Sequence, residues 1–142
     1  MTTVDEIVEC PDRSVGEIAL DLEKLAGFKV RDKHYADLKE IVLKSKEAVR
    51  AKNGQQWPTT SIPAIRNVIT NMGYSDHPPK GHDKEIKFCE TLETKRGDCY
   101  SWFLIYMTIG EALDLPLIGV LREDRLHLTL RWDDAYYRRT HG

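Results

Sequence analysis

The segment from Cys99 to Leu113 constrains the fold more than any other part of the chain. It predicts a helix on which apolar side chains occupy nearly every face. Asp98 stands directly before it and has a side chain suited to a helix N-cap. Leu115-Pro116 follows and ends the helix. A helix that is apolar all round needs protein on every side, so we expect it to lie in the middle of the domain.

Two strands are predicted after this helix. Residues 117–121 form a short apolar run, and residues 125–132 alternate strictly between polar and apolar side chains. The even-numbered positions of the second run are apolar, whereas its odd-numbered positions, His127 among them, are polar. Asp133-Asp134 predicts a turn into a return strand that starts over 136–139. These residues therefore predict a small antiparallel sheet.

Helical periodicity dominates the part of the chain before Cys99. Ser14 and Glu17 fit a capping box at the start of one helix. Further helices are predicted over 35–52, from an N-cap at Ser61 onward, and over 84–95. We therefore predict one α+β domain over 1–142. The helical part spans 14–95, and the Cys-bearing helix and the strands together span 96–142. We expect the helical part and the Cys-bearing helix to pack on the small sheet.

Composition excludes several classes of protein. A net charge of −2 argues against a protein dedicated to nucleic acid. Acidic residues in the first ten positions argue against a signal peptide, and the longest apolar-rich stretch is too short and polar for a membrane span. Three cysteines are an odd, low number, which favours reduced thiols in a cytoplasmic protein. We expect no metal site, because CxxC and HxxxH spacings are missing, and nothing in the sequence implies a cofactor.

Cys99 stands where a nucleophile would. It is the first residue of the predicted buried helix and follows Asp98, an acidic cap. The free amides and the positive end of the helix dipole favour a thiolate there. The Cys99 backbone N–H, unpaired at the helix start, could bind an oxyanion. The alternative is that Cys99 is a small buried apolar residue, a common role for free cysteine.

The C-terminal part of the chain resembles the core of the transglutaminase-like superfamily, a branch of the papain-like cysteine fold. In that family a Gly-x-Cys motif opens a central helix, a Leu-Pro segment leads to a strand, and a His begins the next strand. Residues 88–97 are similar to the family's lead-in, and the preceding helices resemble those of its small bacterial branch. The matching residues are Arg96-Gly97-Asp98-Cys99, Ser101, Tyr106, Ala112-Leu113, Leu115-Pro116, Gly119-Val120 and His127-Leu128-Thr129-Leu130-Arg131-Trp132.

The resemblance implies that Cys99 is the nucleophile and His127 its base, 28 residues later. An imidazole can take the thiol proton and return it to the leaving group. Without the cysteine motif, His127 would be read as a solvent-facing residue on the polar side of its strand.

The third member of a triad is missing from the expected place. The family puts an acidic residue beside the His on the next strand, but a turn at Asp133-Asp134 or one residue later pairs His127 with Thr140 or Gly142. Asp133 lies six residues along the strand from His127, roughly 20 Å, which disfavours both aspartates of the turn. We expect either a natural degeneracy or a chain truncated before the third strand.

Two functions follow from these expectations. The first is thiol-dependent acyl transfer or amide hydrolysis on a peptide or protein substrate, which covers peptidase, transglutaminase and deamidase chemistry. The alternative is a catalytically incomplete module that binds a peptide or a protein partner. The sequence does not set the oligomeric state.

Overall fold

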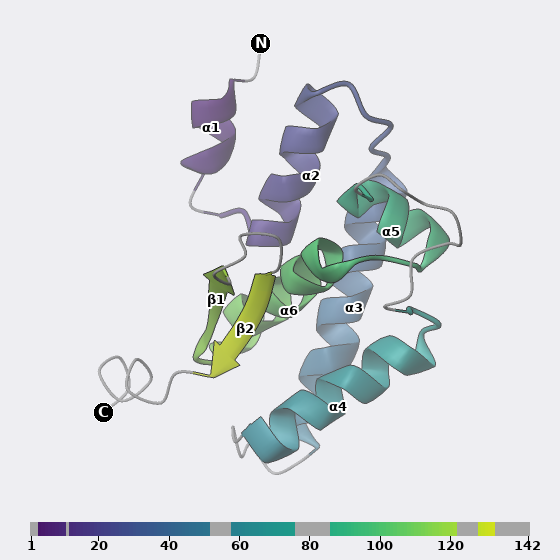
Figure 1. Ribbon diagram of the computed structural model, residues 1–142, viewed down its shortest axis with the longest axis vertical. Helices are drawn as coiled ribbons and strands as arrows, with labels where there is room; N and C mark the ends of the chain where they lie inside the picture. The colour runs from purple at the N-terminus through teal and green to yellow at the C-terminus, as the bar shows by residue number, and fades with distance from the viewer. Residues whose placement is uncertain (1–2, 11, 52–57, 76–85, 122–127, 133–142) are drawn as a thin grey trace.

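The computed structural model describes residues 3–10, 12–51, 58–75, 86–121 and 128–132. Helix α6 lies near the middle, with two strands on one side and helices α3 and α5 on the other (Figure 1). This arrangement confirms the predicted α+β class. The elements are, in chain order, α1 (Val4–Val8), α2 (Val15–Leu25), α3 (Asp32–Arg50), α4 (Pro58–Asn71), α5 (Phe88–Thr94), α6 (Cys99–Leu113), β1 (Leu117–Leu121) and β2 (Leu128–Trp132).

The central position of α6 is confirmed. It packs against α2, α3, α5 and both strands. Leu104, Ile105 and Ile109 are buried on it, as its all-round apolarity predicts. The helix ends at Asp114, which adopts the left-handed conformation at φ 54°.

The two strands predicted after α6 are present, and they pair with each other in antiparallel orientation. Leu117 pairs with Trp132, and Leu121 pairs with Leu128. The polar–apolar alternation is also confirmed where side chains are described, because Trp132 packs against the core while Arg131 is exposed. The first three positions of the predicted second strand, 125–127, and the predicted return strand, 136–139, lie outside the described residues.

The predicted starts of three helices, α3, α4 and α5, are wrong. Helix α3 begins at Asp32, three residues before the predicted position, and the Arg31 backbone N–H donates to His34 Nδ1 there (3.0 Å). Helix α4 begins at Pro58, so Ser61 lies inside the helix and is not its N-cap. Proline suits the first helical position because its φ is already helical and that position needs no N–H. Helix α1 was not predicted at all.

Helix α5 begins at Phe88 rather than at residue 84, and a side chain from α2 explains the start. Glu23 is buried, and its Oε2 accepts a hydrogen bond from the Phe88 N–H (2.7 Å). Its Oε1 accepts from the Cys89 N–H (2.9 Å). Lys87, the N-cap residue, makes no capping bond with its own side chain. Glu23 therefore caps α5 from a distant point in the sequence.

Candidate active site

Cys99 is the first residue of α6 and is exposed. The Asp98 carboxylate fixes this end of the helix, because Oδ1 accepts from the Ser101 N–H (3.3 Å) and Oδ2 from the Ile86 N–H (3.4 Å). The predicted N-cap role of Asp98 is therefore confirmed. The exposure of Cys99 also corrects the alternative expectation that it is a small buried apolar residue.

The segment before Cys99 is held on two sides. A Cβ on Gly97 would lie 2.7 Å from the Thr91 side chain and 3.0 Å from the Ser101 side chain, so glycine allows α5 and α6 to approach closely. Thr91 and Ser101 share a buried hydrogen bond of 2.6 Å between their hydroxyls. On the other side, the Gly97 N–H donates to the Ser75 carbonyl (3.2 Å). These contacts fix the backbone just before Cys99 and so the position of Cys99 at the protein surface.

A cleft of about 730 Å³ opens beside Cys99. Helices α4 and α6 both pack against α3, and the cleft lies between one side-chain stripe from each. On α4 the stripe has a spacing of four residues, and on α6 the spacings are three and four, so each stripe occupies one helix face. Tyr74 and Ser75 line the end of the cleft where α4 meets the segment before α6. The two stripes are Ile62, Arg66 and Thr70 on α4, and Cys99, Trp102 and Tyr106 on α6.

The walls of this cleft are mostly uncharged. Burial, with Asp37 and Glu40 nearby, raises the pKa of Tyr74 to about 12, so its phenol stays neutral. The rings of Trp102 and Tyr106 lie 6.2 Å apart, tilted by 34°. The Trp102 indole N–H is buried, and no acceptor for it occurs among the described residues. Such an orphan donor costs about 1–3 kcal/mol.

Both strands pack beside α6, and β1 runs back along this helix toward its first half. A Cβ on Gly110 would lie 3.1 Å from Leu117 at the start of β1, and a Cβ on Gly119 would lie 2.3 Å from the Phe103 ring. Strand β1 thus proceeds from the last turns of α6 toward its first half, with both strands packed beside the helix (Figure 1). The pair Leu121 and Leu128 forms the end of the two-stranded sheet opposite to Leu117 and Trp132. His127, Asp133 and Asp134 lie outside the described residues.

A second cavity contains the residue types of a cysteine triad. Cys89, His34 and Glu93 line a space of about 550 Å³. His34 Nδ1 accepts from the Arg31 N–H, so the ring proton is on Nε2 and is donated to Glu93 Oε2 (2.8 Å). Burial, followed by the Glu23 carboxylate, raises the pKa of Cys89 to about 12. A thiol of that pKa is not a nucleophile near neutral pH.

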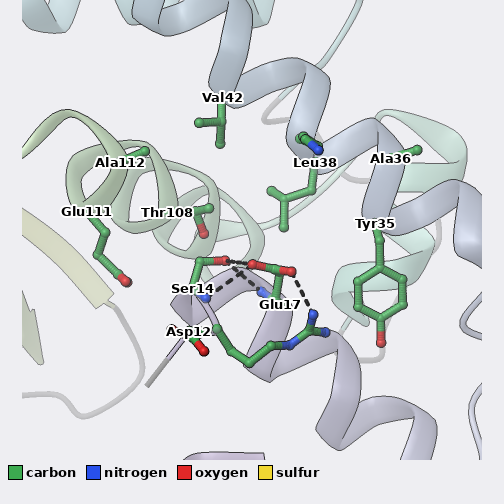
Figure 2. Close-up of a pocket in the computed structure, with 12 residues that line it drawn as sticks. Asp12, Ser14, Glu17, Tyr35, Ala36, Leu38, Val42, Thr108, Glu111 and Ala112 are labelled. Atoms are coloured by element: carbon green, nitrogen blue, oxygen red, sulfur yellow. Dashed lines mark hydrogen bonds and ion pairs between the residues drawn. The ribbon is translucent and has the colours of Figure 1, made fainter. Parts of the chain in front are cut away.

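A third cavity, of about 560 Å³, lies between the start of α2, helix α3 and the end of α6 (Figure 2). Ser14 and Glu17 form the predicted capping box. Arg13 pairs with Glu17 and with Asp21, both at 2.8 Å, and the Tyr35 hydroxyl donates to Asp21 (2.5 Å). These charged groups satisfy one another, so we assign this cavity a structural role.

Sequence reasoning missed the α4 side of the Cys99 cleft, including Arg66 and Tyr74. The spacing of four residues along 62–70 is visible in the sequence, but nothing local indicates that this face lies across from Cys99. The same holds for His34 and Glu93, which are 59 residues apart.

Comparison of the chain with protein-family models, with curated proteins and with solved structures gives no match. The resemblance to transglutaminase-like domains therefore rests on sequence motifs alone. No helix within the described residues combines the length and the apolar character needed to cross a membrane. Across the same ranges, no three His, Cys, Asp or Glu side chains gather closely enough to hold a metal ion.

Proposed function

We propose that this chain is a thiol-dependent acyl-transfer or amide-hydrolysing domain in which Cys99 attacks a carbonyl carbon. The observation that carries the proposal is the exposed thiol at the first residue of a buried helix, on the wall of a cleft of about 730 Å³. A cleft with apolar walls and a few polar groups is typical of a substrate site. The helix start adds amide groups that favour an anion.

In the proposed reaction, the Cys99 sulfur forms a bond to the acyl carbon and the carbon–nitrogen bond of the substrate amide breaks. His127 takes the thiol proton and delivers it to the departing amine. The Cys99 backbone N–H donates to the oxyanion, beside the cap at Asp98. Water or a second amine then attacks the thioester, and this choice separates a peptidase or deamidase from a transglutaminase. The sequence order supports His127 as partner, since it directly precedes Leu128, the first residue of a strand that packs beside α6.

A second function is binding of a peptide or protein partner without turnover. The strand register expected around His127 favours it. The residues expected opposite it, Thr140 or Gly142, carry no carboxylate. In a serine triad, loss of the third carboxylate leaves the histidine in the wrong tautomer and lowers turnover by about 10⁴. A Cys–His pair depends less on the third group because a thiolate forms more readily than an alkoxide.

Thiol labelling and acylation test the proposal. The protein is alkylated with iodoacetamide between pH 5 and 9, and each cysteine is followed by mass spectrometry. Cys99 is expected to react at least about tenfold faster than Cys10 and Cys89 at pH 7, because it is exposed at the start of a helix, whereas Cys89 is buried and Cys10 is half-buried. Exposure alone would also speed Cys99, so the deciding comparison is His127→Ala, which should slow Cys99 below pH 7.

Acylation separates the two functions. With p-nitrophenyl acetate, an acetyl group on Cys99 followed by repeated release of nitrophenolate indicates an enzyme. A stable acetyl group without turnover indicates the binding module. Equal labelling of all three cysteines, with no effect of His127→Ala, would contradict the nucleophile assignment.

A further inference from the structure

We propose that the Cys99 cleft takes acyl substrates that carry a carboxylate group, and that Arg66 binds this carboxylate. The inference rests on the proposed function, since Cys99 supplies the chemistry. It adds the class of substrate, which neither the sequence motifs nor the thiol specify.

The position of Arg66 places it in reach of a bound substrate. It lies between Ile62 and Thr70 on the α4 stripe of the cleft, one helical turn, about 6 Å, from Thr70. Helix α4 ends close to the start of α6, because Ser75 pairs through its backbone with Lys95 and Gly97. The guanidinium is therefore carried by the cleft wall that faces the α6 stripe beginning at Cys99.

The charge of the cleft favours an anionic group. Among the described residues that line it, Arg66 is the one charged side chain. Arg66 is exposed and forms no ion pair within the described part of the chain. Other basic side chains, such as Arg13 and Arg31, are paired with carboxylates. An unpaired guanidinium on a cleft wall suits a carboxylate, which can accept two parallel N–H bonds.

The remaining walls set the rest of the substrate. Tyr74 is a neutral phenol, and Trp102 and Tyr106 present aromatic rings. One cation among apolar walls fits a single carboxylate on a peptide better than a polyanion, which needs several basic groups. The carboxylate has two possible sources, an acidic side chain next to the reacting amide or the C-terminus of a peptide.

Two alkylating reagents of nearly the same shape test the inference on the intact chain. Iodoacetate carries a carboxylate where iodoacetamide carries an amide. The alkylation rate of Cys99 is measured with each reagent and expressed relative to that of N-acetylcysteine. The iodoacetate rate divided by the iodoacetamide rate then isolates the effect of the reagent's charge. We expect Arg66→Gln to lower this ratio at least about threefold, which corresponds to about 0.65 kcal/mol at 1.4 kcal/mol per tenfold. Arg50→Gln makes the same charge change outside the cleft lining and should keep the parent ratio.

Salt gives a second measurement that needs no variant. Raising the ionic strength to 1 M shortens the screening length to about 3 Å, so the parent ratio should fall toward that of Arg66→Gln. A ratio that changes less than threefold in Arg66→Gln overturns the carboxylate assignment. Slow iodoacetamide labelling of Cys99 with an Arg66-dependent ratio would instead contradict the proposed function and leave the recognition intact.

Competition separates the two sources. N-acetyl-glycyl-glycine carries a terminal carboxylate, N-acetyl-glutamate α-amide carries one in its side chain, and N-acetyl-glutamine amide carries none. Protection of Cys99 from iodoacetamide by the first identifies a peptide C-terminus, and protection by the second identifies an acidic side chain. Equal protection by the uncharged compound, or protection by neither acid, overturns the inference.

Discussion

Replacing Glu23 tests whether one buried carboxylate on α2 holds the first turn of α5. Glu23 is 7% exposed, and its two oxygens accept from the N–H groups of Phe88 and Cys89 at 2.7 and 2.9 Å. These are amides of the first helical turn, which have no partner inside their own helix. The carboxylate also faces the positive end of the α5 dipole, which adds to the attraction.

The magnitude follows from the two hydrogen bonds. A hydrogen bond to a charged group contributes about 1.5–3 kcal/mol, and a buried donor left unsatisfied costs about 1–3 kcal/mol. Because the two bonds share one carboxylate, we expect Glu23→Ala to lower the free energy of unfolding by about 3 kcal/mol rather than by their full sum. Glu23→Gln keeps one carbonyl oxygen but turns an NH₂ donor toward an N–H donor, so we expect about half that loss. Against a typical total of about 5–15 kcal/mol, either effect is large.

Urea unfolding at pH 7, followed by circular dichroism, measures both variants. The midpoint should fall in the order parent, Glu23→Gln, Glu23→Ala, with little change in the dependence of the free energy on urea. Glu47→Gln is the matched control, because Glu47 is exposed on α3 and such surface changes stay within about 0.5 kcal/mol. Stabilities of both Glu23 variants within that margin would refute the capping role.

Two further predictions concern the Glu93 ion pairs and the contact between β1 and α6. Arg31, and then His34, hold the pKa of Glu93 at about 2, below its usual 4.5, so its stabilising effect is complete above about pH 4.5 and disappears as the pH falls toward 2. Thermal unfolding of Glu93→Gln should therefore depend less on pH across this range than that of the parent, and identical acid profiles would contradict the pairing. A Cβ on Gly119 would lie 2.3 Å from the Phe103 ring, so Gly119→Ala should destabilise the protein by about 1–3 kcal/mol. Adding Phe103→Leu should restore part of this loss in the same melting experiment, and no recovery would mean that the strain lies elsewhere.

The sequence predicts correctly those parts of the fold that depend on interactions between residues close together in the chain. The capping box of Ser14 and Glu17, the cap at Asp98 and the alternating strand before Trp132 each depend on residues close together in the chain. The start of α5 depends instead on Glu23, 65 residues away from Phe88. The sequence around residues 84–95 does not contain that carboxylate, so a prediction from these residues alone places the helix start too early.

The candidate site divides in the same way. The prediction that Cys99 begins a central helix came from Asp98 and from the apolar run after it, and both features are local. The cleft itself is not local, since it requires α4 and α6 to pack on α3 with their stripes facing one space. Arg66 carries no signal of its own in the sequence, where it is one basic residue among 21. Its significance comes from the neighbours that packing gives it.

The contrast between Cys89 and Cys99 shows why residue types alone do not identify a cysteine nucleophile. Cys89 shares a cavity with His34 and the Glu93 carboxylate. The hydrogen-bonding groups that could activate its thiol are already bound to other partners. His34 accepts on one ring nitrogen and donates on the other, and burial with a nearby carboxylate raises the pKa of Cys89 to about 12. Cys99 has the opposite surroundings, with an exposed sulfur, an amide-rich helix start and an open cleft. A base can approach Cys99 from the cleft, whereas both ring nitrogens of His34 already make hydrogen bonds to other groups than Cys89. We therefore propose Cys99 rather than Cys89 as the nucleophile, because its side chain is exposed beside an open cleft.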